Sequence, residues 1–524
     1  MVSAADSPAF TPDDVARYRA AGWWSDTTIS DSVRANAART PDRLAYLDHP
    51  DQSLTWLEFD TAADTLAREL AGAGVGPGDL VAVWHGDTCA IHVAFVAIER
   101  CGAIVVGIGA RAGTREAAAI ARSAQPHLMI ADRHRHDSAA IVAAEAGCRL
   151  LTLSELSVGI DTPGTPRGRL GADDAFLINS TSGTTGLPKC VVHTQNRWYY
   201  FHQQAVANAV LTADDIFLPV IPTPFGFGLW TSHTTPIFLG AGIVLLERFT
   251  AAAACAAIER HRVSVLCCVS TQLTMIMADP AAHHYDLSSL RVVFTGGETL
   301  PYRPAKEFES LTGATILQFY GSNETGLLSG TTVHDPLEHR LRTGGRIVAD
   351  MQVRLFDGDT DVTATGRGQP ACRGPATSLG YLGDTDHDTL FTRDGWMRMG
   401  DLCEIDDDGY LRVTGRTSDF IVRGGKNISA PEVENVVTTH PAVAVAAAVA
   451  MPDPVFGEKV CVYVELVAAA TLELPGLCAF LLTHGVSKEL LPERLIVLDE
   501  LPRSSGGKIA KGQLREDIRA RTQR

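Results

Sequence analysis

The stretch "STSGTTGLPKC", from Ser180 to Cys190, lies between two apolar runs, "AFLIN" and "VVHT", each short enough to be a strand. It therefore predicts a tight polar loop between two strands. Serine, threonine and glycine can bring hydroxyls and backbone N–H groups close to a phosphate, and Lys189 adds a mobile positive charge. The same composition is common in flexible surface linkers, so the loop alone leaves both interpretations open. It is not a Walker A loop, because Lys189 follows Pro188 and precedes a strand rather than a helix.

The composition of the chain is that of a globular protein, with 45% hydrophobic and 20% charged residues among 524. Its net charge of −16 argues against a nucleic-acid binder, because no broad basic field can gather phosphates. No apolar run approaches the length of a membrane span, and the opening "MVSAADSPAF" lacks the features of a secretory signal. The eleven cysteines are scattered without CxxC pairs, as is typical of reduced thiols. We therefore expect a cytoplasmic protein with neither a membrane nor a nucleic-acid partner.

The order of the predicted elements indicates an α/β protein. The segment "LTWLEFDTAADTLARELAGAG" has apolar residues at helical spacing, and "GDLVAVW" after it is typical of a buried strand. This alternation continues to about residue 350 and predicts largely parallel sheets with helices. Strand-like pieces separated by Gly and Asp turns follow, to about residue 410, and predict a smaller β-rich unit. From Pro431 a compact α/β pattern returns, which indicates a C-terminal domain of roughly a hundred residues.

Five further segments place glycines and polar residues where chemistry could occur. Glu324 follows a strand and a glycine, and a carboxylate beside phosphates is a suitable hard-oxygen ligand for Mg²⁺. Each segment taken alone has a simpler interpretation, such as a strand-to-helix turn, a helix cap or a basic tail. The segments are "FTGGETLP" (294–301), "QFYGSNETG" (318–326), "MRMGDL" (397–402), "GRTSDFIVRGGKNISAPEVE" (415–434) and "LPRSSGGKIAKGQLRE" (501–516).

Together and in this order, these segments resemble the adenylate-forming superfamily of acyl- and aryl-CoA synthetases, amino-acid adenylation domains and luciferases, over essentially the whole chain. The nearest resemblance is to the aryl-acid and alicyclic-acid CoA ligases, whose opening is similar to "YRAAGWW" here. The resemblance implies a large N-terminal adenylation domain over residues 1–417, with parallel sheets, helices and a β-rich subdomain at about 350–417. A small, mobile α+β C-terminal domain would follow over residues 418–524, after a hinge at Ser418.

The resemblance assigns most of the candidate site to the nucleotide. The loop from Thr181 to Lys189 would close over the β- and γ-phosphates of ATP, and Glu324 would bind Mg²⁺. Tyr320 would stack on adenine, and Asp401 would accept hydrogen bonds from the ribose hydroxyls. The expected ATP- and AMP-binding residues are Thr181, Ser182, Gly183, Thr184, Thr185, Gly186, Lys189, Gly297, Glu298, Tyr320, Gly321, Ser322, Asn323, Asp401, Arg416 and Lys508.

The resemblance also implies a two-step reaction. A carboxylate attacks the α-phosphorus of ATP, and charge that builds on the phosphates is stabilised by nearby cations. Lys508, Glu324 and Lys189 are the expected catalytic residues, with Lys508 bridging the carboxylate and the α-phosphate. The C-terminal domain would then turn about Ser418, which withdraws Lys508 and admits a thiol, usually that of CoA.

Several positions depart from the pattern of this superfamily. Ser418 stands where many relatives carry Asp or Lys at the hinge, so a charge-based switch is absent there. Asn323 and Met399 each replace a threonine that is usual at these positions. Gly424 and Gly425 match the pattern and would line the tunnel for the thiol, because a residue without a Cβ permits close approach.

The acid pocket is expected in the segment "IPTPFGFGLW" (221–230), where the superfamily places it. Phenylalanines and glycines favour a flat apolar acid, and the segment has no obvious charged anchor for the ammonium of an amino acid. Trp230 is expected to pack in a helix core. The expected pocket residues are Phe225, Gly226, Phe227, Gly296 and Gly321.

The leading hypothesis is thus an ATP-dependent ligase that joins an aromatic, arylpropenoic or alicyclic carboxylate to CoA, with Mg²⁺ and with AMP and pyrophosphate as products. One alternative is a nitrite-activating diazotase that acts on an aryl amine, which Asn323 and Met399 keep open. Another is a stand-alone aryl-acid AMP ligase that loads a carrier protein. A non-catalytic nucleotide-binding protein is disfavoured, because binding alone does not require Lys508. The sequence does not indicate an oligomeric state.

Overall fold

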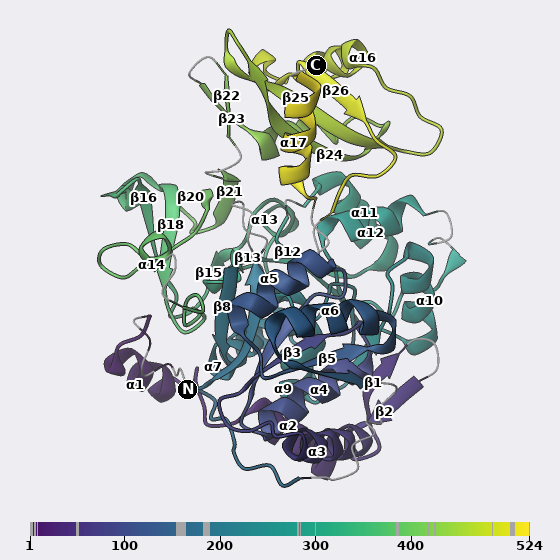
Figure 1. Cartoon of the computed structure of the whole chain (residues 1–524). Helices are drawn as coiled ribbons and strands as arrows, with labels where there is room; N and C mark the ends of the chain where they lie inside the picture. Colours follow the sequence, from purple (N-terminus) through teal and green to yellow (C-terminus); the bar gives the residue numbers. More distant parts are fainter. Residues whose placement is uncertain are drawn as a thin grey trace.

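The structure is a computed structural model of the chain. It describes all residues except 1–3, 5–6, 8, 49–51, 154–163, 182–188, 280–281, 283, 299, 384–386, 417–419, 424–425, 485, 504–508 and 523–524. Figure 1 shows a large body of sheets and helices, a β-rich unit beside it, and a further unit at the C-terminal end. Helix α1 (Pro12–Ala20) lies near the N-terminus.

One sheet of the large body has six strands in the order β6-β5-β3-β4-β7-β8, and all are parallel except β8. Its central strands are apolar and buried on both faces, as parallel strands covered by helices are. The strands are β3 (Leu80–Trp84), β4 (Ile104–Ile108), β5 (Leu128–Asp132), β6 (Arg149–Leu153), β7 (Ala175–Thr181) and β8 (Lys189–Thr194). The connecting helices are α4 (Cys89–Arg100), α5 (Thr114–Ala124) and α6 (His136–Ala146), with the 3₁₀ turn η2 (Arg133–Arg135).

The second sheet has nine strands in the order β15-β14-β13-β12-β11-β9-β10-β1-β2, and its six central strands are parallel. The antiparallel strands β2, β14 and β15 lie at its edges. The strands are β1 (Leu44–Asp48), β2 (Gln52–Thr55), β9 (Ile216–Pro219), β10 (Gly242–Leu245), β11 (Val265–Cys267), β12 (Val292–Gly296), β13 (Thr315–Ser322), β14 (Gly326–Gly330) and β15 (Arg346–Ile347).

The helices of this half are α2 (Ile29–Arg39), α3 (Trp56–Gly72), α7 (Gln195–Ala209), α8 (Gly226–Leu229), the π-helical turn η3 (Trp230–Thr234), α9 (Thr235–Leu239), α10 (Ala251–His261), α11 (Ser270–Ala278), α12 (Tyr302–Thr312) and α13 (Leu337–Arg342). Helix α3 confirms the helix predicted from apolar spacing. Thr55 and Glu58 form a capping box at its start, and its apolar face is buried. One continuous core contains side chains of α2, α3, α4 and α7 and of both sheets, so the two sheets form a single body.

The β-rich unit predicted at about 350–417 is an antiparallel sheet in the order β17-β16-β18-β20-β21, with β19 beside β18. Its strands are β16 (Gln352–Asp357), β17 (Thr360–Asp361), β18 (Arg367–Arg373), β19 (Met397–Arg398), β20 (Asp401–Ile405) and β21 (Leu411–Arg416). The short helices are η5 (Thr363–Thr365) and α14 (His387–Leu390). Met399, between β19 and β20, is buried in the large core.

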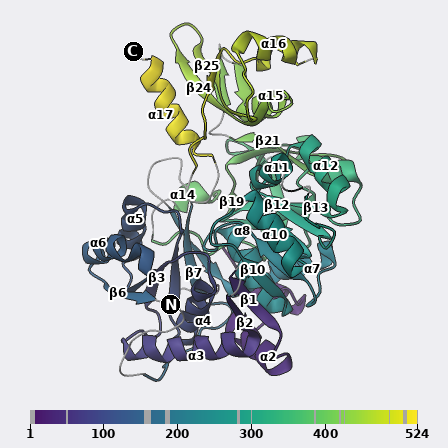
Figure 2. The ribbon, with the colours of Figure 1, turned by 90° about the vertical axis from the view of Figure 1, so that its right-hand side faces the viewer.

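The C-terminal unit has a sheet in the order β23-β22-β25-β24, with β26 parallel to β25. Separate clusters of buried side chains form its own core. Its elements are β22 (Phe420–Arg423), β23 (Lys426–Ser429), α15 (Ala430–Val437), β24 (Val443–Asp453), β25 (Gly457–Leu466), α16 (Leu474–Thr483), η6 (Lys488–Leu490), β26 (Arg494–Val497) and α17 (Lys511–Thr522). Figures 1 and 2 both show it at one end of the molecule.

The predicted α/β class, with a large N-terminal part and a small C-terminal part, is confirmed. The boundary at Ser418 stays a prediction, because residues 417–419 lie outside the described residues, between the end of β21 and the start of β22. Within the described part of the chain, no helix is both long and apolar enough to cross a membrane.

Candidate active site

The stretch from Ser180 to Cys190 lies between β7 and β8, the two predicted strands, which pair antiparallel. Thr181 lies opposite Lys189, and Ser180 lies opposite Cys190. The predicted phosphate-binding residues Ser182, Gly183, Thr184, Thr185 and Gly186 fall outside the described residues, so their role stays a prediction. The described strands fix where the loop leaves and re-enters the sheet.

Tyr381 joins the two charged residues predicted for the phosphates and the metal. The ammonium of Lys189 lies 5.0 Å from the centre of the Tyr381 ring, in a cation–π contact. The Tyr381 hydroxyl donates a hydrogen bond to Oε1 of Glu324 at 2.9 Å. Lys189 and Glu324, which are 135 positions apart, therefore lie on either side of one tyrosine.

Tyr381 was not among the predicted site residues. It belongs to a segment that runs beside β8, where Leu382 N–H donates to the Cys190 carbonyl at 2.8 Å and Val192 N–H donates to the Gly380 carbonyl at 2.9 Å. The one signal in the sequence is an aromatic residue between glycines in "GYLG" (380–383). That pattern does not reveal a partner almost 200 positions earlier.

The turn between β13 and β14 holds Glu324 in place. The backbone N–H of Ser322 donates to the Thr325 hydroxyl, and the backbone N–H of Thr325 donates to the Ser322 hydroxyl, each at 3.0 Å. The Glu324 carbonyl accepts from Ser378 N–H at 2.8 Å. A Cβ at Gly321 would lie 1.8 Å from the Gly326 carbonyl oxygen, so this turn closes only with a glycine. The carboxylate of Glu324 is thus presented from a fixed backbone.

Tyr320 and Asp401, predicted for adenine and ribose, are in direct contact. The Tyr320 hydroxyl donates to Oδ2 of Asp401 at 2.9 Å, and Cys403 Sγ lies 3.5 Å from the same hydroxyl. Burial raises the pKa of Tyr320 well above its usual value, and the neighbouring Cys403 and Asp401 add to the shift, so the phenol stays a neutral donor. Arg416 lies opposite Asp401 in the β20–β21 pairing.

The predicted site residues Gly296, Gly297 and Glu298 lie at the carboxyl end of β12. Gly296 pairs with Phe319 of β13, and a Cβ at Gly296 would lie 2.5 Å from the Phe319 carbonyl oxygen. Gly297 comes next, with φ +78°. Oε2 of Glu298 accepts a hydrogen bond from the Ser270 hydroxyl at 2.8 Å, at the start of α11. The carboxyl ends of neighbouring parallel strands thus bring this segment next to Tyr320, as α/β sites commonly do.

The predicted acid pocket lies against the same turn. Phe225 immediately precedes α8, and the Phe227 ring stacks on Trp230 with centroids 5.5 Å apart. Trp230 is buried, as predicted. A Cβ on Gly226 would lie 2.9 Å from Oδ1 of Asn323, the residue next to Glu324. The pocket segment therefore contacts the residue next to the candidate metal ligand at Gly226.

The remaining predicted residues are not tested by the geometry. Lys508, Ser418, Gly424 and Gly425 lie outside the described residues.

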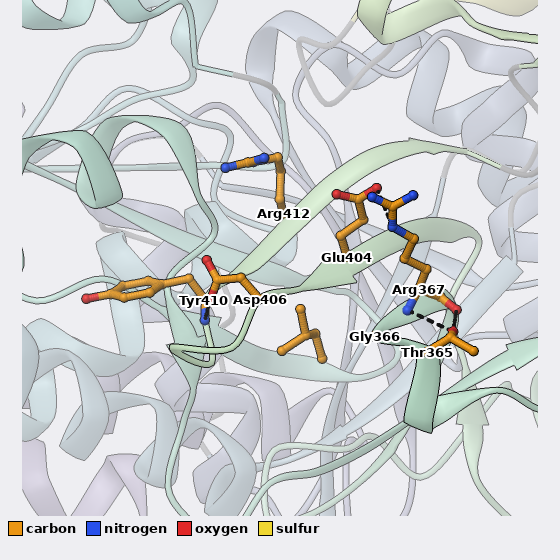
Figure 3. Close-up of a pocket in the computed structure, with 8 residues that line it drawn as sticks. Thr365, Gly366, Arg367, Glu404, Asp406, Tyr410 and Arg412 are labelled. Atoms are coloured by element: carbon orange, nitrogen blue, oxygen red, sulfur yellow. Dashed lines mark hydrogen bonds and ion pairs between the residues drawn. The ribbon is translucent and has the colours of Figure 1, made fainter.

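A hollow of about 190 Å³ lies elsewhere, on the β-rich unit, and is shown in Figure 3. It contains an ion pair of 3.1 Å between Arg367 and Glu404. No predicted site residue lines it. Its lining residues are Thr365, Gly366, Arg367, Glu404, Ile405, Asp406, Tyr410 and Arg412.

The donor set suits a hard cation that is shared with phosphates. Among the described residues, no group of three or more His, Cys, Asp or Glu side chains converges as a metal cage. Mg²⁺ is typically bound through one or two carboxylates together with phosphates and waters, so a single fixed carboxylate such as Glu324 fits. Lys189 lies near this carboxylate, because Tyr381 contacts both residues.

The chain is similar to known proteins over nearly its whole length. The family model described as AMP-binding enzyme matches residues 33–382, and that of the AMP-binding enzyme C-terminal domain matches residues 432–508. The chain is 34% identical to a salicyl-AMP ligase / salicyl-S-ArCP synthetase of Mycobacterium tuberculosis, over 96% of this chain and 93% of that protein. It is 32% identical to the medium-chain fatty-acid–CoA ligase of Escherichia coli, over 97% and 93%. A solved anthranilate CoA ligase shares the fold, with a TM-score of 0.88, 23% identity and coverage of 95% and 98%.

Proposed function

Because the chain belongs to the AMP-binding enzyme family of adenylate-forming ligases, we propose that it activates an aromatic, arylpropenoic or alicyclic carboxylate with ATP and transfers the acyl group to CoA. The observation that carries the proposal is the contact of Lys189 and Glu324 with one tyrosine. It joins a cation at the end of a Ser/Thr/Gly loop to a fixed carboxylate. That pair suits a nucleotide whose phosphates are bound with a divalent cation.

In the first step, a substrate carboxylate oxygen attacks the α-phosphorus of ATP and pyrophosphate leaves. Lys189 and the loop before it would bind the β- and γ-phosphates, and Glu324 would hold Mg²⁺. When bound, Mg²⁺ would supply positive charge where negative charge accumulates. Lys508 bridges the attacking carboxylate and the α-phosphate as a point charge. Tyr320 and Asp401 orient the nucleoside, so that the α-phosphorus faces the acid pocket.

The aromatic side chains around the pocket support a planar acid over a long flexible chain. Phe227 is stacked on Trp230, and Trp230 packs edge-on against Phe294 and Phe319. Trp230, Phe294 and Phe319 are buried and hold the partly exposed ring of Phe227 in place, and such a ring suits a flat acid. An apolar slot discriminates by only about 1–3 kcal/mol per methylene, so we expect several related acids to react.

The acceptor distinguishes the remaining candidates. The salicyl-AMP ligase relative carries the second name salicyl-S-ArCP synthetase, which supports a carrier protein as an alternative acceptor. The diazotase alternative was kept open by Asn323 and Met399. Met399 is buried in the core, and Asn323 is hydrogen-bonded to Asn179 at 2.6 Å, so both departures have structural explanations that need no nitrite chemistry.

Mass spectrometry of parallel reactions tests the proposal. Each contains ATP, Mg²⁺ and a panel of benzoate, salicylate, cinnamate, cyclohexanecarboxylate and octanoate, with either CoA or a pantetheinylated carrier protein as acceptor. A third set contains nitrite and aminobenzoates. We expect AMP, pyrophosphate and an acyl-CoA. Acylation of the carrier alone would reassign the acceptor, nitrogen loss in the third set would favour the diazotase, and absence of AMP from every set would overturn acid activation.

A further inference from the structure

A buried guanidinium lies beneath the turn that carries Glu324. Arg197, on α7, is 2% exposed. Its Nη1 donates to the Asn323 carbonyl at 3.0 Å, and its Nε donates to the Ala376 carbonyl at 2.9 Å. Burial lowers the pKa of Arg197 to about 9, which still leaves it charged at neutral pH. Because burying a charge is costly unless it is well paired, these contacts fix both backbone segments firmly.

The directions of the hydrogen bonds around Arg197 can be assigned from chemistry alone. Arginine only donates, so Nδ1 of His193 accepts from it and the proton of that ring lies on Nε2. This agrees with burial, which lowers the pKa of His193 well below its usual value and keeps it neutral. His193 Nε2–H then donates to Oδ1 of Asn179 at 2.7 Å. The Asn179 oxygen is therefore an acceptor.

Asn323 donates a second hydrogen bond to the side-chain oxygen of Asn179. Nδ2 of Asn323 donates to Oδ1 of Asn179 at 2.6 Å, and Nδ2 of Asn179 donates to the Pro224 carbonyl at 2.6 Å. Pro224 immediately precedes the pocket residues Phe225 to Phe227. Asn179 is 1% exposed, so this chain of bonds is shielded from water. It runs from the pocket segment through β7 to the turn of Glu324.

Asn323 also shapes the pocket directly. Its Oδ1 is buried, has no hydrogen-bond partner within the described part of the chain, and faces Gly226. A Cβ on Gly226 would approach this oxygen to 2.9 Å, which is closer than real Cβ contacts allow. The pocket segment and the Asn323 amide therefore fit only as a pair.

We propose that Asn323 is a positioning residue that couples the acid pocket to the metal-binding carboxylate. The inference rests on the proposed function. The side chain of Asn323 is tied to the pocket segment through Asn179, its carbonyl is tied to Arg197, and its neighbour in the chain is Glu324. These bonds hold the pocket segment and the carboxylate in one fixed arrangement, so that acid and metal favour each other's binding.

Asn323→Asp tests this coupling. Aspartate has nearly the same shape, but its carboxylate cannot donate to Oδ1 of Asn179. The matched control is Asn36→Asp. Asn36 is 2% exposed, and its Nδ2 donates to the Ile237 carbonyl at 2.8 Å, in contact with α9 and outside the proposed site. Both variants lose one side-chain donor, and the melting temperature of each shows whether it folds.

The first measurement is the ATP affinity of each variant by calorimetric titration, once in the presence of Mg²⁺ and once in the presence of EDTA. It needs no acid substrate. We expect Asn323→Asp to reduce the gain in ATP affinity from Mg²⁺ by about three- to tenfold, the range for one lost buried hydrogen bond. Asn36→Asp should keep the full gain. In pyrophosphate exchange with salicylate, Asn323→Asp should also raise the KM for the acid. In this variant the KM for the acid should no longer depend on the Mg²⁺ concentration, nor the Mg²⁺ requirement on the acid concentration.

A second variant approaches from the pocket side and covers the case in which Asn323→Asp does not fold. Gly226→Ala places a methyl group against Asn323. It should reduce the gain in ATP affinity that Mg²⁺ gives, although Gly226 is not a metal ligand. Adding Asn323→Ser should restore part of it. An unchanged gain in Asn323→Asp, or in Gly226→Ala, overturns the coupling. If the parent enzyme binds MgATP but none of the tested acids supports pyrophosphate exchange, the proposed function alone is overturned. The calorimetric comparison would still decide the coupling.

Discussion

The turn around Glu324 and the C-terminal unit differ in how they are held. Glu324 lies in a region cross-linked by side chains from β7, α7 and the segment beside β8. The C-terminal unit has its own core, and it meets β21 through α15, where the Ser429 hydroxyl donates to the Thr414 carbonyl at 2.7 Å. The first region is thus built to hold charged groups in fixed positions, whereas we propose that the second turns as a body about the predicted hinge. We infer that nucleotide and metal bind to the large domain, and that the chemistry depends on a residue brought by the small one.

The sharpest way to break this comparison is to remove the lysine that the C-terminal unit would bring. Lys508→Ala should reduce the rate of acid-dependent pyrophosphate exchange by on the order of a hundredfold or more, because its charge acts in the transition state. ATP affinity and melting temperature should change little. Exchange at the parental rate would show that the small domain is not needed for adenylation.

Within the large domain, the metal carboxylate should have the next largest effect. Glu324→Gln keeps the shape but removes the charge that a hard cation prefers, so the Mg²⁺ concentration for half-maximal exchange should rise about tenfold or more. A magnesium titration at saturating acid measures this, with the melting temperature as the control for folding. A titration curve that matches the parent's would make Glu324 a structural acid.

A smaller effect is expected at Tyr381. Its hydroxyl and its ring make different contacts, and two substitutions can remove them one at a time. Tyr381→Phe removes the hydroxyl that donates to Glu324 but keeps the ring beneath Lys189. We expect a rise of about three- to tenfold in the Mg²⁺ requirement with the KM for ATP nearly unchanged. Tyr381→Leu should also raise the KM for ATP, because the cation–π contact is lost. If the two variants behave alike in both titrations, the ring does not position Lys189.

These residues also show what sequence can and cannot reveal. The helix beginning at Trp56 and the hairpin strands around the opening loop were predictable, because apolar spacing and turn residues act locally. Tyr381 and Arg197 were missed, since their partners lie far away in the chain and neither has a distinctive neighbourhood. Asn323 was noticed only as a departure from a pattern. Its partner Asn179 lies on another strand, and no local rule brings the two amides together.

The smallest expected effect concerns the acid stability of the large domain. Burial lowers the pKa of His202 on α7 to about 4. In the unfolded chain the pKa of His202 is near 6.5, so its imidazole is protonated there first as the pH falls. The contribution of the neutral His202 to the free energy of unfolding is therefore present above about pH 6.5 and is lost toward pH 4. His202→Phe should flatten the slope of unfolding free energy against pH by about 1.4 kcal/mol per pH unit near pH 5. Urea unfolding between pH 7 and pH 4.5 measures the slope, and an unchanged slope would mean that His202 is protonated in the folded protein.

The most direct test is a crystal structure of the full chain with ATP and Mn²⁺ as an anomalous stand-in for Mg²⁺. We predict an anomalous peak within coordinating distance of the Glu324 carboxylate, phosphate oxygens beside Lys189, adenine against Tyr320 and ribose hydroxyls on Asp401. The described region around Glu324 should move little from its present arrangement, because its hydrogen bonds are already made. A nucleotide bound away from these residues, or a metal held without Glu324, would contradict the claim that the large domain prebuilds the nucleotide site.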